Sequence, residues 1–282
     1  MLAGEFPYRT FTHSSGFPFL YLISFPFYLI GKIGYLELSG YLLFWLCLIY
    51  ISKSVKTLLI RIILLMLMPA FYYEFLVNSE LFFNMALVIS LVILTEKFLH
   101  SDKIDFRFTL FAVIYGLVLS TRLNIGVFYI IYLLWFFRQN INKLILFAGI
   151  AFLSFLLTVL PFAIWDPGYF FESGPFIIQF QYLPQWTLII FLFVLLFTGW
   201  VVSNMQEVFF ATGLMSFFLV TAYFIYYIYY SGLEAAIFGK YCFDMSYFIF
   251  CIPFLILSVE EYKIDNYLGK VYINNTNMLK NK

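Results

Sequence analysis

Residues 143–164 read KLILFAGIAFLSFLLTVLPFAI, and this stretch decides the fold class. Its one charged residue is Lys143, at the first position. A helix needs about 20 apolar residues to cross the hydrocarbon core of a bilayer. The stretch therefore predicts an α-helix that spans a membrane.

The composition of the whole chain agrees with this prediction. Of its 282 residues, 64% are hydrophobic and 11% are charged, whereas a soluble domain is about half apolar and about a quarter charged. A soluble fold of this size has too little interior to bury so much apolar surface. The net charge of +1 gives no reason to expect a nucleic acid as partner. We therefore expect an integral membrane protein whose first partners are lipids.

Further apolar runs predict the rest of the bundle. Together with 143–164, they give about nine spans, at 35–51, 57–73, 80–95, 106–121, 123–137, 187–203, 207–230 and 245–259. The run 16–30 contains Pro18 and Pro26. Proline removes a backbone hydrogen bond that lipid cannot replace, so this run is predicted to lie at the membrane interface. The predicted fold class is an all-α, polytopic transmembrane helical bundle with an N-terminal interfacial helix.

Basic residues predict how the bundle is oriented. If residues 1–34 lie outside, 12 of the 16 Lys and Arg residues fall on the opposite face, as the positive-inside rule requires of a cytoplasmic face. This predicts a multi-pass protein of a bacterial inner or plasma membrane with a cytoplasmic C-terminus. One transmembrane domain occupies 1–259, with an outer loop and the interfacial helix in 1–34, and 260–282 form a polar tail. The polar start and odd span count also predict that a preceding helix is missing from this chain.

Arg122 is the sharpest polar signal on the predicted outer face. It stands between two apolar runs with no Gly or Pro beside it, which places the guanidinium at or below the membrane surface. A charge at that depth is costly unless it faces protein or a wet cavity. Guanidinium is also a fork-shaped donor suited to phosphate. Two interpretations stay open: a phosphate-binding arginine, or a turn arginine paired with Glu74 or Glu80.

Other outer residues are weaker candidates. A carboxylate near Arg122 has the chemistry of a general base or of a magnesium ligand; the alternative is a solvated acid or an ion pair. Aromatic residues such as Tyr8 suit stacking on sugars, but they also anchor proteins at interfaces. The sequence contains no P-loop, GxGxxG, HExxH or GxSxG pattern, which argues against ATP-driven transport and zinc hydrolysis by this chain alone. No metal ligands are predicted, and a divalent cation as cofactor stays open.

Several short motifs resemble one family. The stretch Gly4-Glu5-Phe6-Pro7-Tyr8-Arg9-Thr10-Phe11, the proline-containing segment after Phe17, and the segment from Gly116 to Asn124 resemble bacterial polytopic glycosyltransferases of the C-type (GT-C) superfamily, mannosyltransferase-like members included. The resemblance implies sugar transfer from a polyprenyl-phosphate donor on the outer face, with a catalytic acid in the first outer loop. Relatives often show Asp where this chain has Thr10, so Glu5 is the nearest acid.

We therefore expect Glu5 to be catalytic. The residues expected to bind substrate are Arg122, Arg9, His13, Tyr8, Glu74 and Asp166. Two other functions stay open: a non-catalytic membrane subunit or inactive fragment, and a transporter or flippase of lipid-linked or small polar substrates. A transporter predicts charges or broken helices at the bilayer midplane, and charges within the predicted spans are scarce. The sugar, the acceptor and the oligomeric state are not fixed by the sequence.

Overall fold

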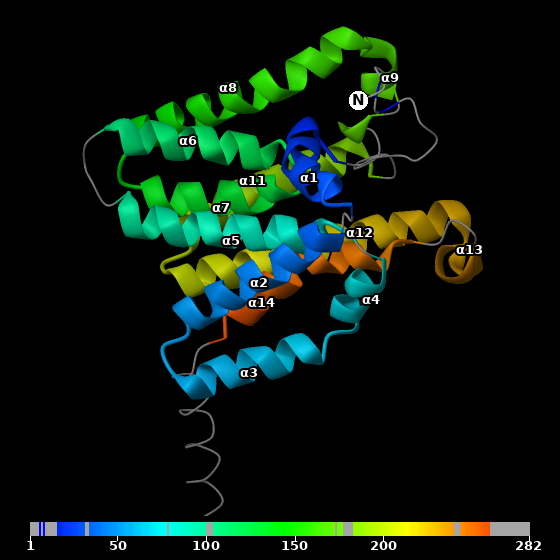
Figure 1. Cartoon of the computed structure of the whole chain (residues 1–282), viewed down its shortest axis with the longest axis horizontal. Coiled ribbons are helices and arrows are strands. Elements are labelled where there is room, and N and C mark those ends of the chain that lie inside the picture. Colours follow the sequence, from blue (N-terminus) through cyan, green and yellow to red (C-terminus); the bar gives the residue numbers. More distant parts are fainter. Residues whose placement is uncertain are drawn as a thin grey trace, which may run out of the picture.

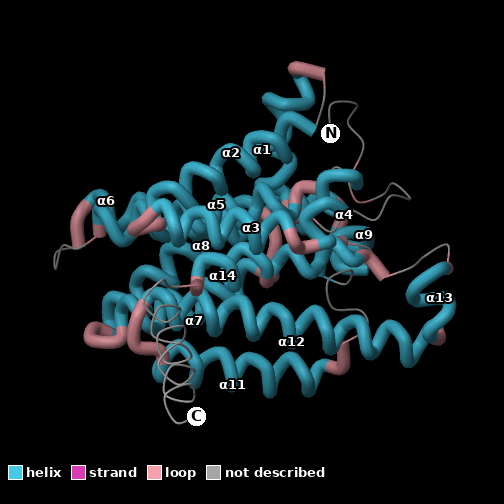
Figure 2. Tube along the Cα trace, turned by 90° about the horizontal axis from the view of Figure 1, so that it is seen from below, coloured by secondary structure: helices cyan, strands magenta, loops and turns pink. Residues whose placement is uncertain are grey.

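The computed structural model describes residues 6, 8, 16–31, 34–77, 79–99, 104–172, 174–176, 183–239 and 243–259. All regular elements among them are helices (Figure 2), which confirms the all-α prediction. They are α1 Pro18–Leu29, α2 Gly34–Ile51, α3 Val55–Met66, α4 Pro69–Val77, α5 Leu81–Phe98, α6 Phe106–Leu119, α7 Ile125–Phe137, α8 Ile141–Trp165, α9 Pro167–Glu172, α11 Gln185–Val201, α12 Met205–Ser231, α13 Leu233–Phe238, the 3₁₀ helix η1 Met245–Phe250 and α14 Ile252–Leu257. The predicted tail 260–282 lies outside this part of the chain.

Four helices, α2, α5, α8 and α12, are long and apolar enough to cross a membrane. The predicted span 57–73 is instead a bent pair, because α3 and α4 meet at an angle of 64°. Pro69 at the start of α4 explains the break, since it has no N–H to continue the hydrogen-bond ladder of α3. Counting this pair gives five candidate spans. The other predicted spans correspond to apolar helices of 10–17 residues.

The helices lie side by side along the long axis of the molecule (Figure 1). Helices α5, α6 and α7 run nearly parallel to that axis and α8 is inclined to them, whereas α1 runs across the bundle (Figure 1). The outer surface of the bundle is apolar: Leu157 on α8 is 73% exposed and Phe197 on α11 is 70% exposed. An apolar surface of this extent is compatible with a bundle embedded in lipid.

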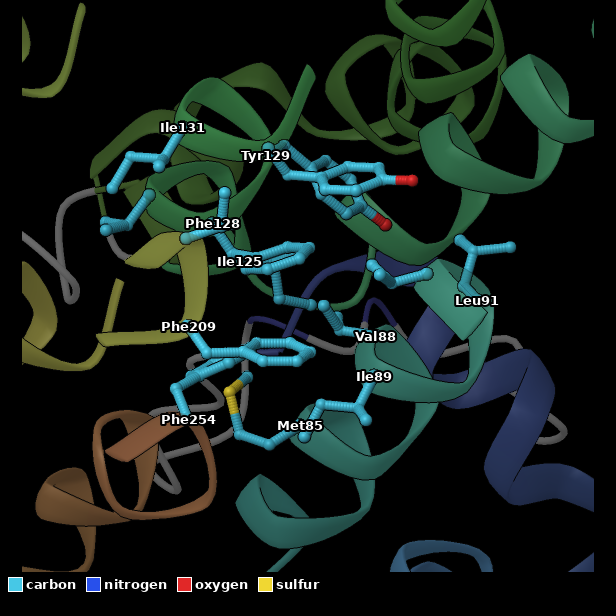
Figure 3. Close-up of a cluster of buried hydrophobic side chains, with 14 of the residues drawn as sticks. Met85, Val88, Ile89, Leu91, Ile125, Phe128, Tyr129, Ile131, Phe209 and Phe254 are labelled. Carbon is cyan, nitrogen blue, oxygen red and sulfur yellow. The ribbon is translucent and has the colours of Figure 1, made fainter. Parts of the chain in front are cut away.

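The core is built around α5. Its first six residues, 81–86, are all buried, and its side chains Met85, Val88 and Ile89 face α7, α12 and α14 (Figure 3). Phe128 on α7 stacks on Phe254 on α14, with ring centroids 5.0 Å apart and an interplanar angle of 13°. Stacked and edge-on aromatic pairs add about 0.5–1.5 kcal/mol each to the burial of their surface. The high Phe content of the chain thus serves packing here.

Arg61 is a buried charged residue that connects α3 to the end of α14. Although it belongs to the apolar helix α3, it is 3% exposed. Its Nη2 donates to the carbonyl oxygens of Leu257, at 2.9 Å, and Val259, at 3.0 Å, and its Nη1 donates to Ser52 Oγ at 3.0 Å. The last carbonyl groups of a helix have no partner within the helix, and a cation there also complements the helix dipole. Arg61 therefore joins the end of α14 to α3 and to the loop before it.

Small residues let helix backbones approach each other closely. A Cβ atom built on Gly116 in α6 would lie 2.0 Å from the backbone oxygen of Ala151 in α8. In α2, a Cβ atom on Gly40 would lie 2.6 Å from the Cα atom of Phe83 in α5. Small residues at helix contacts are typical of membrane bundles, where close packing replaces the hydrophobic driving force. These two glycines set the spacing of α6 from α8 and of α2 from α5.

Gly116→Ala should destabilise the bundle by about 1–3 kcal/mol, because the added methyl group meets backbone that cannot move aside without separating α6 from α8. The matched control is Gly149→Ala on α8, where a Cβ atom meets nothing within 4 Å. Thermal unfolding in detergent micelles measures both. Equal melting temperatures for the two variants would contradict this account of the helix contact.

Candidate functional site

The loop between α6 and α7 is buried, although it lies at an end of the bundle. Ser120 and Thr121 are fully buried and Arg122 is 5% exposed. The covering element is α1, since the Phe17 N–H donates to the Thr121 carbonyl at 3.0 Å and the Phe19 N–H donates to the Ser120 carbonyl at 3.1 Å. The loop thus supplies acceptors for N–H groups at the start of α1, which have no partner within that helix.

Arg122 forms an ion pair with Glu80, the residue that precedes α5. The Arg122 side chain is 6% exposed and the Glu80 side chain 30% exposed. Burial alone would raise the pKa of the Glu80 carboxyl, but the neighbouring Arg122 guanidinium holds that pKa below its ordinary value. Of the two partners considered for Arg122, the structure therefore shows Glu80. We call Arg122, Glu80 and their polar neighbours Glu74, Asn84 and Tyr247 the Arg122 centre.

Glu74 lies near this pair but has a different partner. It is fully buried in α4, and its Oε1 accepts the N–H of Phe82 at 3.0 Å. Its carboxyl group interacts electrostatically with Glu80 and with Glu37 of α2. Glu37 is also buried, and its Oε1 accepts the Tyr41 hydroxyl at 2.9 Å. Glu74 thus fastens α4 to the first turn of α5 beside the ion pair.

Two members of the Arg122 centre were not found from the sequence. Asn84 is fully buried one turn after Glu80 on α5, and neither of its amide atoms has a hydrogen-bond partner in the described part of the chain. Tyr247 in η1 interacts electrostatically with Arg122 and Glu80. A polar residue inside an apolar run was a usable signal for Asn84. Tyr247 gave no such signal, because it is one of 23 tyrosines.

An apolar cavity of about 1160 Å³ lies between the α3–α4 pair and α12, η1 and α14. It is lined by Leu64, Leu67, Met68, Pro69, Ala70, Tyr72, Tyr73, Leu76, Phe210, Phe217, Met245, Phe248, Cys251, Ile252, Leu255, Ile256, Ser258 and Val259. Two of the helices that line the cavity, η1 and α4, also carry residues of the Arg122 centre. In η1, Met245 and Phe248 line the cavity while Tyr247 interacts with Arg122. In α4, Tyr73 lines the cavity while Glu74 binds the start of α5.

The remaining predicted site residues have other positions. Tyr8 is buried, its hydroxyl donates to the Gly16 carbonyl at 3.0 Å, and its ring packs edge-on against Phe170 at 5.4 Å. Burial raises the pKa of its hydroxyl. Tyr8 belongs to a small buried cluster with Phe6 and Phe17, and the N–H of Phe17 binds the Arg122 loop.

At the end of α8, Asp166 Oδ1 accepts the Tyr169 N–H at 3.3 Å. Glu5, Arg9 and His13 lie outside the described residues.

The chemistry that the Arg122 centre offers is binding of an anion. A guanidinium donates in a fork that fits the oxygens of a carboxylate, as it does here with Glu80, and the same fork fits phosphate oxygens. Within the described ranges, no group of three or more His, Cys, Asp or Glu residues is arranged to hold a metal ion.

Comparison of the chain with known protein families, curated proteins and solved structures finds no match. The fold and the site define the class: an all-helical chain with membrane-length apolar helices, a buried ion pair at one end and a large apolar cavity beside it.

Replacing Arg122 alone should cost more stability than replacing the pair. Arg122→Met leaves the Glu80 carboxylate without its cation, which should cost about 3 kcal/mol, the low end for buried pairs because Glu80 keeps part of its surface exposed. Arg122→Met with Glu80→Gln should recover most of that loss. Thermal unfolding of both variants in the same detergent measures the difference.

The pH dependence supplies a control for this experiment. The Glu80 pKa is lowered in the folded state, so the pair stabilises the fold above the ordinary carboxyl pKa of about 4.3, and this stabilisation is lost as the pH falls through the lowered value. Wild type and Arg122→Met should therefore converge in stability toward acid pH. A constant difference down to that range would show that Glu80 does not act as the partner charge.

Proposed function

We propose that this chain is a membrane glycosyltransferase that takes a sugar from a polyprenyl-phosphate donor and transfers it at the end of the bundle that holds Arg122. One observation carries the proposal: the buried Arg122 centre and the apolar cavity of about 1160 Å³ share the walls α4 and η1. A lipid-linked phosphate presents a charged group and a long hydrocarbon chain next to each other, and this pair of sites matches both.

The chemistry of each part supports this match. Guanidinium binds phosphate in a bidentate manner, and a partly exposed Glu80 is a counter-ion that a phosphate can replace. The cavity is larger than the roughly 300–1,000 Å³ of typical small-molecule sites and is lined almost wholly by apolar residues. Those properties favour a long hydrocarbon chain over a small polar metabolite.

Glu5 is proposed as the general base that activates the acceptor hydroxyl, as the resemblance to GT-C enzymes implies. Phe6, the next residue, is buried and packs edge-on against Trp165 at 5.4 Å and Tyr8 at 5.6 Å. The same cluster contains Phe17, which hydrogen-bonds the loop of Arg122. The chain is therefore anchored near the Arg122 loop one residue after Glu5.

Sugar transfer from a polyprenyl-phosphate donor in reconstituted membranes should fall at least about 100-fold in Arg122→Ala, because a charge that stabilises the phosphate leaving group is lost. Glu5→Gln should show a similar loss. The control is Arg107→Ala, an exposed arginine at the opposite end of the bundle, which should leave transfer unchanged.

A further pair of variants separates folding from function. Arg122→Met with Glu80→Gln should fold well and still fail to transfer sugar; wild-type transfer by this variant would refute the role of Arg122. Leu67→Trp fills the cavity from an exposed position, whereas Leu59→Trp changes an exposed residue of the same helix that does not line it. Leu67→Trp should discriminate against long-chain donors relative to short-chain ones, and Leu59→Trp should not.

We also propose nine crossings, with the Arg122 centre on the outer side and α1 at the interface. Support comes from the distribution of Lys and Arg and from the direction of α1 across the bundle (Figure 1). The shorter helices would cross where the bundle shields their ends from lipid.

Cysteine labelling tests this orientation. In a background whose native cysteines are replaced by alanine, Gly168→Cys should react with an impermeant maleimide added outside, and Ser203→Cys should react only after the membrane is opened. Both positions are exposed and lie at opposite ends of the bundle. Reaction of Ser203→Cys in sealed cells would reverse the proposed orientation.

A transporter of lipid-linked substrates is the second candidate, because the bent α3–α4 pair and the buried carboxylates of Glu37 and Glu74 are features that transporters use. Glu37, however, lies in the first turn of α2 and Glu74 in the last turns of α4, near helix ends rather than at mid-helix. Movement of a labelled lipid between leaflets without sugar transfer would favour this second function.

A further inference from the structure

A second cavity lies at the other end of the bundle, away from the Arg122 centre. Its volume is about 340 Å³, and it is enclosed by the end of α2, the end of α5 and the beginning of α12. Most of its wall is apolar, but Glu96 and Lys97 of α5 bring two opposite charges to it, and Tyr50 and Phe209 bring two aromatic rings. Neither the proposed sugar transfer nor the packing of the core accounts for this combination.

The Glu96 carboxylate is held in a fixed position from inside the bundle. The Tyr132 hydroxyl donates to Glu96 Oε1 at 2.9 Å, and Tyr132 itself is fully buried in α7. Its ring stacks parallel to that of Tyr115, whose hydroxyl is 3.1 Å from Thr95 Oγ1. The buried Tyr132, itself packed against the buried Tyr115, thus orients a carboxylate that also borders the cavity, which is the preorganisation that a binding site needs.

The surroundings of Glu96 select a particular chemical group. A primary ammonium has three N–H donors that a carboxylate accepts, and the exposed aromatic ring of Tyr50 in the cavity wall favours a cation nearby. Lys97 follows directly in the sequence, is exposed, and suits an anion bonded to that ammonium through a short linker. The volume is near the low end for small-molecule sites and so fits a headgroup without its tails.

The position of the cavity indicates where such a ligand would come from. The cavity opens where two membrane-length helices, α2 and α5, end and a third, α12, begins. Helix ends of this kind lie at the level of lipid headgroups, where Lys and Tyr side chains are also at home. Val92 of α5, one turn before Glu96, also lines the cavity and continues its apolar wall away from the helix end.

We propose that this cavity binds the headgroup of an aminophospholipid, with Glu96 pairing with the primary ammonium of ethanolamine phosphate and Lys97 pairing with the phosphate. The site is independent of the Arg122 centre, and it would stabilise the protein in membranes that contain this lipid.

The experiment compares thermal unfolding in nanodiscs made of phosphatidylcholine alone with unfolding in nanodiscs that also contain phosphatidylethanolamine. Wild type should melt about 3–5 °C higher with phosphatidylethanolamine, as expected for a ligand in large excess over its dissociation constant. Glu96→Gln keeps an acceptor for the Tyr132 hydroxyl but removes the charge, so it should fold and lose this increment. Lys97→Gln should lose part of it.

Matched controls and alternative ligands complete the test. Glu207→Gln changes another acid at the same end of the bundle that does not line the cavity, and it should keep the full increment. Replacing the ethanolamine amine by its dimethyl form should reduce the increment, because fewer N–H donors remain. An equal increment in wild type and Glu96→Gln would overturn the proposal. Equal protection by free phosphoethanolamine added to phosphatidylcholine discs would overturn the assignment to a lipid.

Discussion

The ion pair between Arg122 and Glu80 is the interaction on which one end of this bundle depends. A guanidinium that is 5% exposed is costly unless an anion lies beside it. By meeting Glu80, Arg122 fixes the α6–α7 loop against the start of α5, the helix at the centre of the core. The same loop then offers its carbonyl groups to α1. One buried charge thus determines how four helices meet.

The bend between α3 and α4 lies beside the large apolar cavity. Pro69 interrupts the helical hydrogen bonding after α3, and α4 leaves at an angle of 64°; the cavity lies between this bent pair and α12, η1 and α14. This apolar cavity borders the Arg122 centre through η1. At the far end of the bundle, Arg61 binds the carbonyl oxygens of Leu257, at the end of α14, and of Val259 beyond it, whereas the side of the cavity formed by α4 and η1 borders the polar Arg122 centre. This polarity along the cavity suits a ligand that is itself charged at one end.

Arg122 shows how far sequence reasoning reaches for a site. Two apolar runs with no turn residue between them predicted a guanidinium at or below the membrane surface, and in the structure Arg122 is 5% exposed and surrounded by protein. Its partner was left open between Glu74 and Glu80, because both acids lie in the same short polar segment between two apolar runs. The choice depends on how α4 packs: its turn directs Glu74 toward the Phe82 N–H and leaves Glu80 to face the loop. Tyr247, more than 120 residues away in the chain, came from packing alone.

The sequence by itself determined the helical class, the positions of the apolar runs and the isolation of Arg122, because these depend on local composition and on the cost of placing charge in an apolar setting. Only the tertiary structure decided that the run 57–73 is two helices, that Glu80 is the partner of Arg122, that Tyr132 orients Glu96, and that a cavity separates α4 from α12. Those features arise from contacts between segments distant in the chain, and no local pattern specifies which surfaces of two helices will meet.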